Sequence, residues 1–524
     1  MRSELRLHPA TLLFGLWTQV KNFAVPAILV VVGASRSSGP GDVSRWMPGM
    51  PPWMSNGWEV WLLVLLIPAA LVTVARYLSF RLRYEEHEIV IRTGLIFRNE
   101  RHVPYSRIQN VDAIQNVFHR MLQVVEVRVE TGGGKEEEAR LSVVSREACE
   151  ELRRQVFRKR SPLAAADPDA PPQTVAPEVE GQTLLHLSLR DVLLCGLLEN
   201  KGMVVIGAAY GLTWETGIVD RFWAGLFGND TYGQGFFRAI YGFVFEGDPL
   251  PAVPIALGAA LGIALLLFVR LVSMVWAFVR LYDFRLTRMG DDLRTTYGLF
   301  TQVTTTVPIR RVQTLIVSAG PIHRWLKRAT VRVETAGGVG KENTAANVRE
   351  WLAPLILQAD VPELLRQAVP GLDLSHLDWQ PLHPRAFKRA LKPNLIMTAF
   401  MTLLAAVVIG WGAVGILMLT LPWAILSARQ YVRHLAWAES DEVVVMRSGW
   451  IWQEVTIARA NKIQAVTLHQ SPFDRRAAMA RVRVDTAGAS PMAHRIDIPY
   501  LDGEVARALH HRLSAHAANS AFRW

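Results

Sequence analysis

Residues 94–111 read GLIFRNERHVPYSRIQNV, and shortly after them residues 125–134 read VEVRVETGGG. The first block recurs as GLFTQVTTTVPIRRVQTL from Gly298 and as GWIWQEVTIARANKIQAV from Gly449. The second block follows each of these at the same distance, as ATVRVETAGG and ARVRVDTAGA. The copies align without a gap, which predicts one structural module used three times.

Each copy alternates between strand and helix patterns. Val125, Val127 and Val129 alternate with charged residues, which is typical of a strand with one buried face. The first copy is expected to contain strands at 88–93, 95–103, 107–113, 124–131 and 139–144, a short helix at 116–122 and a closing amphipathic helix at 145–160. Such a module would form a small curved sheet or barrel capped by its last helix.

Apolar stretches precede each module. A helix needs about 20 apolar residues to span a bilayer. Residues 58–78 and 251–278 each meet this requirement, and residues 395–426 suffice for a tight helical pair that turns near Gly410. These stretches predict an integral membrane protein.

Two further stretches, 11–33 and 189–214, are less clear because they contain Lys21 and Lys201. Each could span the bilayer with its lysine reaching toward the headgroups or a partner helix. Each could also lie in the interface with its first half and insert only its second half. The first interpretation is favoured, because the shorter parts cannot cross the hydrocarbon, and it gives six spans in three hairpins.

The distribution of charge predicts the orientation. The chain has a formal net charge of +11, which by itself would suit nucleic acid or anionic lipid. Few of the 57 Lys and Arg residues lie in the hairpin loops, namely 35–57, the aromatic-rich 215–250 and the short third loop. By the positive-inside rule the modules and both termini face the cytoplasm, and no nucleic-acid partner is expected.

The repeated pattern resembles a known family. An apolar hairpin, a strand ending in Gly-Leu-Ile/Phe, a strand with Arg-Ile-Gln and the block Val-Arg-Val-Glu-Thr are similar to the bacterial pleckstrin-homology-like (PH-like) membrane proteins of the YdbS/YdbT type. The resemblance implies a roll of about seven strands with a C-terminal helix in each module, in the bacterial cytoplasmic membrane. It offers no catalytic residues to carry over. In the third copy Lys462 and Asp485 replace an arginine and a glutamate, with charge retained.

The expected organisation is therefore three α-helical transmembrane hairpins alternating with three β-rich PH-like modules. Its segments are transmembrane hairpin 1 at 1–80, PH-like module 1 at 81–160, a disordered linker at 161–184, hairpin 2 with an aromatic outer loop at 185–281, module 2 at 282–370, a linker at 371–392, hairpin 3 at 393–430 and module 3 at 431–516.

Motifs for catalysis, metals or cofactors are not evident. Residues 337–343, GGVGKEN, lack the Ser or Thr that follows the lysine of a phosphate-binding loop, and they align with an ordinary turn in the other copies. Cys149 and Cys195 are expected to be buried thiols. His119 and His323 are interpreted as partly exposed residues of a short helix, because the third copy has Asp474 there.

The repeated polar residues form a candidate partner- or lipid-binding surface. Nine aligned positions belong to it: Arg107, Gln109, Arg128, Arg311, Gln313, Arg332, Lys462, Gln464 and Arg483. One interpretation is structural, with the arginines paired to carboxylates of neighbouring strands. The other is a binding surface beside an anionic leaflet, where each basic side chain contributes about 1 kcal/mol.

Three functions remain open at this stage. The leading hypothesis is a non-enzymatic scaffold for other membrane proteins, which could include a one-module relative or a second copy of the chain itself. The family resemblance loosely implies a role in envelope stress or antimicrobial resistance. The alternatives are an array of anionic-lipid-binding modules and a transporter or channel component using Lys21, Lys201 and Glu199.

Overall fold

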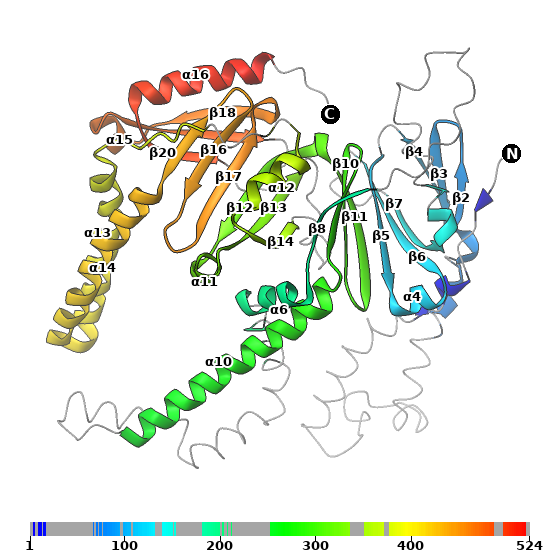
Figure 1. The fold of residues 1–524 in the computed structure, drawn as a ribbon, viewed down its shortest axis with the longest axis horizontal. Coiled ribbons are helices and arrows are strands. Elements are labelled where there is room, and N and C mark those ends of the chain that lie inside the picture. Colours follow the sequence, from blue (N-terminus) through cyan, green and yellow to red (C-terminus); the bar gives the residue numbers. More distant parts are fainter. Residues whose placement is uncertain are drawn as a thin grey trace, which may run out of the picture. The chain divides into compact units, whose positions relative to one another are not determined.

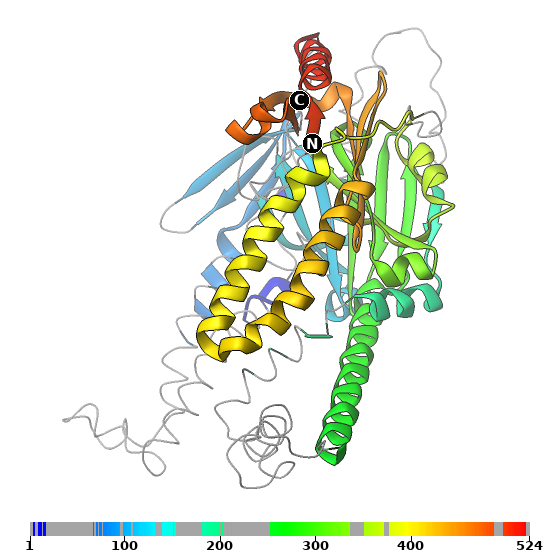
Figure 2. The same ribbon diagram turned by 90° about the vertical axis from the view of Figure 1, so that its left-hand side faces the viewer.

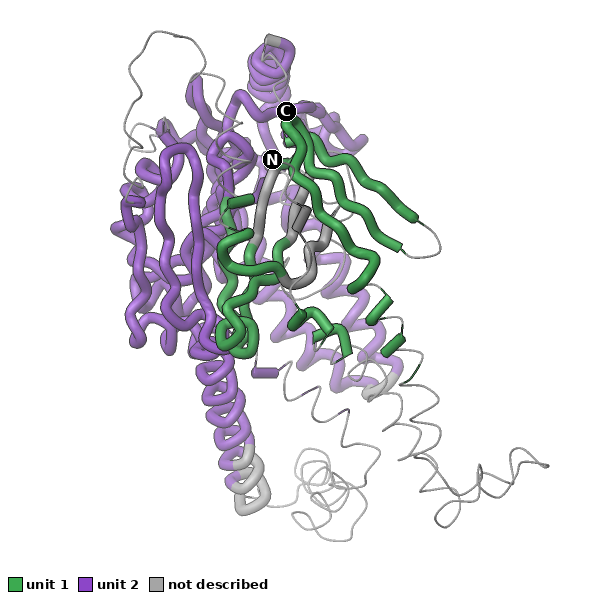
Figure 3. The backbone as a smooth tube through the Cα atoms, turned by 90° about the vertical axis from the view of Figure 1, so that its right-hand side faces the viewer, with its two compact units in different colours: residues 1–177, 301–306 green, residues 178–300, 307–524 purple. Residues whose placement is uncertain are grey.

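The computed structural model describes the chain over residues 70–94, 98–131, 139–152, 181–199, 252–335, 351–370, 377–486 and 496–519, apart from single residues within these ranges, and at a few isolated positions elsewhere. By internal contacts the chain divides into two units (Figure 3). Unit 1 comprises Met1–Pro177 with Thr301–Thr306, and unit 2 comprises Glu178–Phe300 with Val307–Trp524.

Unit 1 contains the first module, which consists of two antiparallel sheets and the start of its closing helix (Figure 1). The first sheet contains, in spatial order, β1 (Glu4–Leu5), β2 (Arg81–Tyr84), β3 (Glu88–Thr93) and β4 (Asn99–Pro104). The second contains β5 (Ile108–Asn116), β6 (Val124–Thr131) and β7 (Ala139–Ser145). Apolar residues of both sheets and of the closing helix share one core, including Leu82, Ile89, Val127 and Leu152. These elements confirm the predicted fold class.

The short helix α4 (Val117–Met121) connects β5 to β6. Asn116 caps it by accepting from the backbone N–H of His119 at 2.7 Å, while the backbone N–H of Asn116 donates to His119 Nδ1 at 3.2 Å. The expectation that His119 is partly exposed is wrong. The capping role turns its ring inward against Phe14, only 5 % of the residue is exposed, and burial lowers its pKa.

Unit 2 contains the corresponding strands of the second module. β8 (Gln182–His186), β9 (Arg285–Met289) and β10 (Asp292–Tyr297) are antiparallel neighbours, and β12 (Val312–Ala319), β13 (Arg328–Thr335) and β14 (Trp351–Leu357) form the second half. A 3-10 turn, η6 (Ile309–Arg311), precedes β12. The short helix α11 (Pro321–Trp325) follows β12, and α12 (Val361–Ala368) closes the module. Strand β11 (Thr301–Pro308) begins in unit 1 and ends in unit 2.

The third module lies wholly in unit 2. Its strands are β15 (Ala436–Glu439), β16 (Val443–Ser448), β17 (Gln453–Arg459), β18 (Ile463–His469), β19 (Met479–Thr486) and β20 (Ile496–Asp502). Its helical elements are η9 (Ala460–Lys462), α15 (Pro472–Arg476) and α16 (Gly503–Asn519). Leu509 and Leu513 of α16 complete its core, as expected of the closing helix.

Turn positions repeat with the sequence. Gly94, Gly298 and Gly449 all have positive φ angles, and each directly follows the strand that was predicted to end there. At Gly449 a Cβ atom would lie 1.8 Å from the carbonyl oxygen of Trp452, so no larger residue fits there.

The segment ahead of each hairpin also has a defined role. β1 pairs with β2, β8 pairs with β9, and Gln380 forms an isolated bridge to Trp437 of β15. The chain thus pairs with the first strand of each module before it enters the hairpin.

Three described helices are long and apolar enough to cross a membrane. α13 (Ala386–Ile409) and α14 (Ala413–His434) lie side by side and are joined by the 3-10 turn η8 (Gly410–Gly412), which confirms the predicted third hairpin (Figure 2). Side chains along them are strongly exposed, for example 80 % for Val407 and 77 % for Leu419. Apolar side chains that are this exposed on a helix of spanning length are expected to face lipid.

The second hairpin is less regular. α10 (Ala252–Leu281) is the third long helix, whereas its partner α6 (Leu189–Leu198) has only ten residues. Glu199 is extended, so residues 189–214 do not form one continuous helix. Arg270 donates to the carbonyl oxygens of Leu197 at 3.0 Å and Glu199 at 3.4 Å, which satisfies the end of α6. This break favours the interpretation in which the two halves of that stretch behave separately.

Several predictions fall outside the described residues. Residues 17–66, most of 199–251 and all of 153–180 belong to this group. The predictions affected concern Lys21, Lys201, the aromatic loop at 215–250 and most of the linker at 161–184. The turn at 337–343 also lies outside the described residues. The first hairpin and the proposed transport path therefore stay predictions.

Candidate functional site

Neighbouring modules are joined through their strand edges. In unit 2 a six-stranded sheet has the order β14-β13-β12-β17-β16-β15, so β12 of the second module pairs with β17 of the third. The antiparallel pairing runs from Thr314 opposite Ala458 to Ala319 opposite Gln453. Main-chain pairing of this kind, with apolar side chains buried on both strands, makes a continuous structure from two repeats.

The same connection occurs in unit 1. There Thr301–Thr304 of β11 pair with β5, and Thr304 lies opposite Ala113. By the repeat, Ala113 corresponds to Val317 and Thr304 to Val455, and Val317 does lie opposite Val455 in unit 2. The two junctions therefore use the same strands in the same register.

Side-chain contacts reinforce the junction in unit 2. Arg324 of α11 donates to the carbonyl oxygen of Ile451 at 3.1 Å, and the hydroxyls of Thr314 and Thr486 lie 3.4 Å apart. Arg459 Nη1 donates to the carbonyl oxygen of Ile309 at 3.5 Å. These three contacts each reach from the second module to the third.

The nine residues of the predicted surface have described side chains in the second and third copies only. In the first copy Arg107 lies outside the described residues, and for Gln109 and Arg128 only the backbone is described. In the second copy Gln313 is only 3 % exposed, and its amide donates to the carbonyl oxygen of Arg311 at 3.2 Å. Placing Gln313 on a binding surface was therefore wrong, because its side chain is used inside the turn that precedes β12.

The aligned arginines point to a structural role. Arg332 lies opposite Trp351 and places its guanidinium carbon 5.8 Å from the centre of that ring. Arg483 lies opposite Asp497, with 3.6 Å between Nη2 and the carboxylate. The partner on the neighbouring strand differs between copies while the position is the same, which favours cross-strand packing over a shared ligand.

Gln464 differs from its counterpart in the second module, because β18 is the outer strand of its sheet in the described part of the chain. Gln464 is exposed, unlike Gln313. Lys462 is half-buried, and this burial, together with the guanidinium groups of Arg459 and Arg310, lowers its pKa. The sequence alone could not distinguish these positions, because the repeats are alike there and only the neighbouring strand is different.

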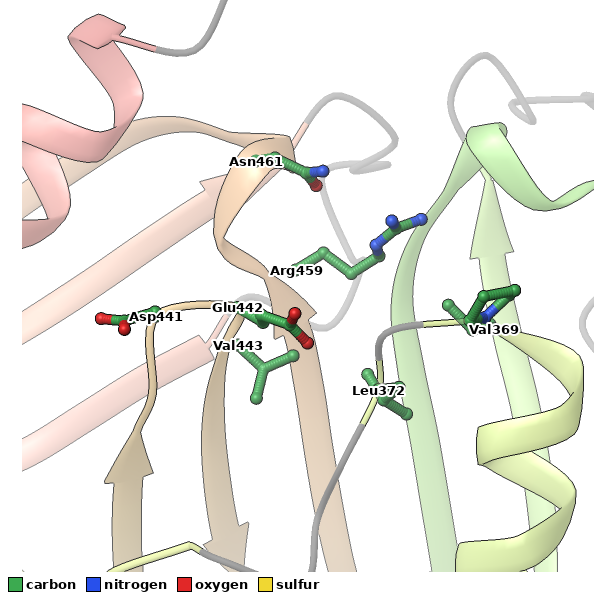
Figure 4. Close-up of a pocket in the computed structure, with 8 residues that line it drawn as sticks. Val369, Leu372, Asp441, Glu442, Val443, Arg459 and Asn461 are labelled. Carbon is green, nitrogen blue, oxygen red and sulfur yellow. The ribbon is translucent and has the colours of Figure 1, made fainter.

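One cavity of about 180 Å³ lies in unit 2 beside this basic group (Figure 4). Asp441 and Glu442 come from the turn between β15 and β16, Arg459 from the end of β17, and Val369 and Leu372 from the segment after α12. Burial lowers the pKa of Arg459, while the charge of Glu442 opposes this change. Acidic and basic groups thus compensate each other, and the cavity has no excess charge suited to an anion. Among the described residues, no three His, Cys, Asp or Glu side chains could hold a metal ion together.

The base of the third hairpin is bound to its module. Arg389 of α13 forms an ion pair with Asp474 of α15 at 2.9 Å and also lies over the ring of Phe473, 5.7 Å from its centre. Trp450, in the turn between β16 and β17, lies 5.8 Å from Trp423 of α14 between ring centres. Two separate parts of the module therefore contact the two helices of the hairpin.

Large aromatic residues around this base are exposed. Trp452 is 70 % exposed in the same turn, and Trp325 is 82 % exposed at the end of α11. Neither tryptophan was predicted to be functional, although the apolar sequence GWIW at residues 449–452 was a visible signal for Trp452. Exposed tryptophans beside a membrane helix are typical of the bilayer interface.

Apolar helices long enough to span a bilayer, alternating with paired β-rich modules, define an integral membrane protein with tandem PH-like modules. Its family follows from comparison with known proteins. The chain belongs to the family described as Bacterial PH domain, which matches residues 25–160, 247–367 and 392–517.

A curated relative supports this assignment. The chain is 23 % identical over 436 residues to the UPF0699 transmembrane protein YdbT of Bacillus subtilis (strain 168), covering 82 % of this chain and 84 % of that protein. No solved structure matches the chain. The predicted resemblance to YdbT-type membrane proteins is thereby confirmed.

Proposed function

We propose that this protein is a non-enzymatic scaffold in the bacterial cytoplasmic membrane, which presents its three PH-like modules to other membrane proteins on the cytoplasmic side. The observation that carries the proposal is the repeated strand junction. Both junctions have the same register, and in unit 2 main-chain pairing joins the second and third modules into one sheet rather than leaving them loosely tethered. A row of such modules offers a partner several linked contacts, which raises its effective concentration.

The third hairpin supports the proposed orientation. Lys388, Arg389 and Lys392 lie in the first two turns of α13, and Arg433 lies in the last turn of α14, so this end of the hairpin is basic. The connecting turn Gly410–Gly412 has no charged side chain. By the positive-inside rule the basic end, with the module attached to it, faces the cytoplasm.

Cysteine labelling in intact cells tests this topology. A membrane-impermeant maleimide should label Trp411→Cys in the turn, where the native residue is 92 % exposed, without permeabilisation. Val505→Cys on α16, Ile322→Cys on α11 and Phe118→Cys on α4 should react only after permeabilisation. The native Cys149 and Cys195 are buried, so they provide a low background. External labelling of any one module site would contradict the proposed topology.

Site-specific photo-crosslinking in native membranes tests the scaffold role. Benzophenone side chains in place of Phe118 and Glu363, both exposed on modules, should give discrete protein adducts. The same group in place of Val407, 80 % exposed on α13, is the control and should give mainly lipid adducts. If the module sites also gave only lipid adducts, the scaffold proposal would fail in favour of headgroup recognition.

A second candidate function is direct binding of the bilayer surface by the modules. The contact between Trp450 and Trp423 favours it, because it holds the turn that carries Trp452 beside a membrane helix. A polarity-sensitive dye on Trp452→Cys should shift to shorter wavelength in anionic nanodiscs compared with detergent micelles of matched apolar content. The same dye on Thr467→Cys, exposed on β18, is the control and should not shift. Equal behaviour of the two sites would contradict this function.

A further inference from the structure

In the described part of the chain, the strand that accepts the neighbouring module occurs three times, and two of the three copies are paired on their outer edge. β5 receives β11 and β12 receives β17. β18 is the third copy of this strand, and in the described part of the chain it is the outer strand of the sheet β18-β19-β20. The acceptor strand of the third module therefore has an outer edge that meets no other described strand.

Burial along the two strands differs as expected for one covered and one open edge. In β12, Thr314, Leu315 and Ile316 are each no more than 2 % exposed. Their counterparts in β18 are Ala465, Val466 and Thr467, of which the first and the last are exposed and Val466 is half-buried. The two strands pair in the same way on their other side, and β12 alone of the two has a described strand on its outer edge, so the neighbour accounts for the difference.

The composition of β18 is unusual for an outer strand. Its seven residues, IQAVTLH, include no Lys, Arg, Asp, Glu or Pro. Outer strands of soluble sheets normally carry such residues, because they prevent pairing with other chains. β18 has kept the composition of a strand that is paired on both sides.

The opposite end of the row is protected. β4, the first copy of the donor strand, is the outer strand of its sheet in the described part of the chain and reads NERHVP. Glu100 forms an ion pair with Arg92 at 2.9 Å, and His102 lies 2.8 Å from Glu88. The covered counterparts of residues 100–102 are threonines in β11 and Val455, Thr456 and Ile457 in β17.

This asymmetry decides against a second copy as the partner. In the common register, β4 of another copy would place Glu100 opposite Leu468 and Arg101 opposite Thr467. Pairing would remove water from these charges and provide no opposite charge in β18. A donor strand resembling β17 would instead place β-branched residues opposite β18, which suits cross-strand packing.

We propose that the outer edge of β18 binds a PH-like module of another polypeptide, through an uncharged, β-branched donor strand that pairs antiparallel in the register of the two internal junctions. In that register Val466, Thr467 and Leu468 face the partner residues that correspond to Ile457, Thr456 and Val455. The inference rests on the proposed scaffold function and specifies the class of its partner.

Disulfide trapping on the full-length protein in nanodiscs tests the register. The probe is a synthetic peptide with the sequence of residues 453–461 and Thr456→Cys, offered to the variant Thr467→Cys. Directly opposite residues of antiparallel strands lie within disulfide distance. The trap should form about tenfold faster than with peptides that carry Val455→Cys or Ile457→Cys, because a shift by one residue turns the thiol to the other face. Equal rates for all three peptides would overturn the proposal.

A control variant and a second probe complete the experiment. The variant Val505→Cys, whose thiol would be exposed on α16, should form disulfides with every peptide at the background rate of free thiol exchange. A peptide of residues 98–105 with Arg101→Cys represents a second copy and should trap at the background rate. If it trapped as fast as the first peptide, the partner would be another copy of this chain, and the proposal would fail.

Backbone methylation provides a readout independent of any substitution in the protein. N-methylation of the first peptide at alternate residues removes donors from one of its edges only. Two peptides are compared, one methylated at 455 and 457 and the other at 456 and 458. One pattern should prevent trapping, and the other should leave it unchanged. Equal effects of the two patterns would contradict strand pairing. Protein adducts at the module sites together with failure of this trap would leave the scaffold function intact and refute only the inference about β18.

Discussion

The second and third hairpins belong to the same repeat, yet they are held together by different means. α6 and α10 approach through small residues: a Cβ at Gly196 would lie 2.6 Å from the Met274 Cα, and Ser273 is 1 % exposed. α13 and α14 are antiparallel helices joined by a polar side chain, Asn394, which donates to Ser427 Oγ at 3.3 Å. The modules repeat the same strand pairing, whereas the two hairpins use different contacts between their helices.

Each hairpin is also fixed to its own module by an ion pair, but at unrelated positions of the repeat. Asp191 of α6 lies 3.0 Å from Arg328 of β13, and Arg389 of α13 lies 2.9 Å from Asp474 of α15. The acidic partner is on the helix in one case and on the module in the other. The fold therefore requires a coupling between helix and module, and it does not prescribe which residues provide it.

The largest expected effect concerns the glycine contact of the second hairpin. Gly196→Val would drive its side chain into the backbone of Ser273 and Met274, and we expect it to lower the free energy of unfolding by about 3 kcal/mol. Thermal unfolding of the detergent-solubilised protein measures this loss. Gly262→Val on α10, where a Cβ meets nothing within 4 Å, is the matched control. Equal stability of the two variants would mean that α6 does not pack closely on α10.

The next effect compares the two ion pairs directly. Asp191→Ala and Arg389→Ala should each cost about 1–2 kcal/mol, because all four partners are at most 26 % exposed and water screens them little. Double-mutant cycles with Arg328→Ala and Asp474→Ala isolate the coupling energies. The exposed pair of Arg366 with Glu363 should give almost none, since its side chains are 67 % and 49 % exposed. If the coupling energies in both hairpins were as small as that of Arg366 with Glu363, these ion pairs would not hold the hairpins to their modules.

The sequence predicted the modules more fully than the connections between them. The alternation of Val125, Val127 and Val129 fixed the register of one strand locally, and the turn at Gly410–Gly412 followed from an apolar stretch too long for one span. Pairing of β12 with β17 could not be predicted in this way, because it depends on two strand edges separated by more than a hundred residues. The burial of His119 and the break at Glu199 also depend on distant partners, Phe14 and Arg270.

A smaller effect should appear with pH, in the third hairpin only. Burial raises the pKa of Asp474, but hydrogen bonds from Ser471 and Arg389 outweigh it, so the pKa in the folded protein lies below the ordinary value of 3.8. Such a group stabilises the fold above its ordinary pKa, and this contribution is lost as the pH falls through the folded pKa.

The melting temperature of the native protein should therefore exceed that of Asp474→Asn at pH 6. The difference should shrink as the pH falls below about 4, where the carboxylate takes up a proton. Scans of both proteins between pH 3 and pH 7 measure this convergence. A difference that stays constant over the range would show that the charge of Asp474 does not stabilise the module.

The smallest effect distinguishes the third hairpin from the second inside the membrane. Asn394 donates to the carbonyl oxygen of Ala424 at 3.4 Å as well as to Ser427, so Asn394→Ala removes both bonds between the helices. Hydrogen bonds between membrane helices are worth about 0.6 kcal/mol on average, because the separated helices also find polar partners. Ser427→Ala should cost less, since it leaves the bond to Ala424 in place. A loss at Asn394 as large as that at Gly196 would mean that polar contacts hold this hairpin as firmly as close packing holds the other.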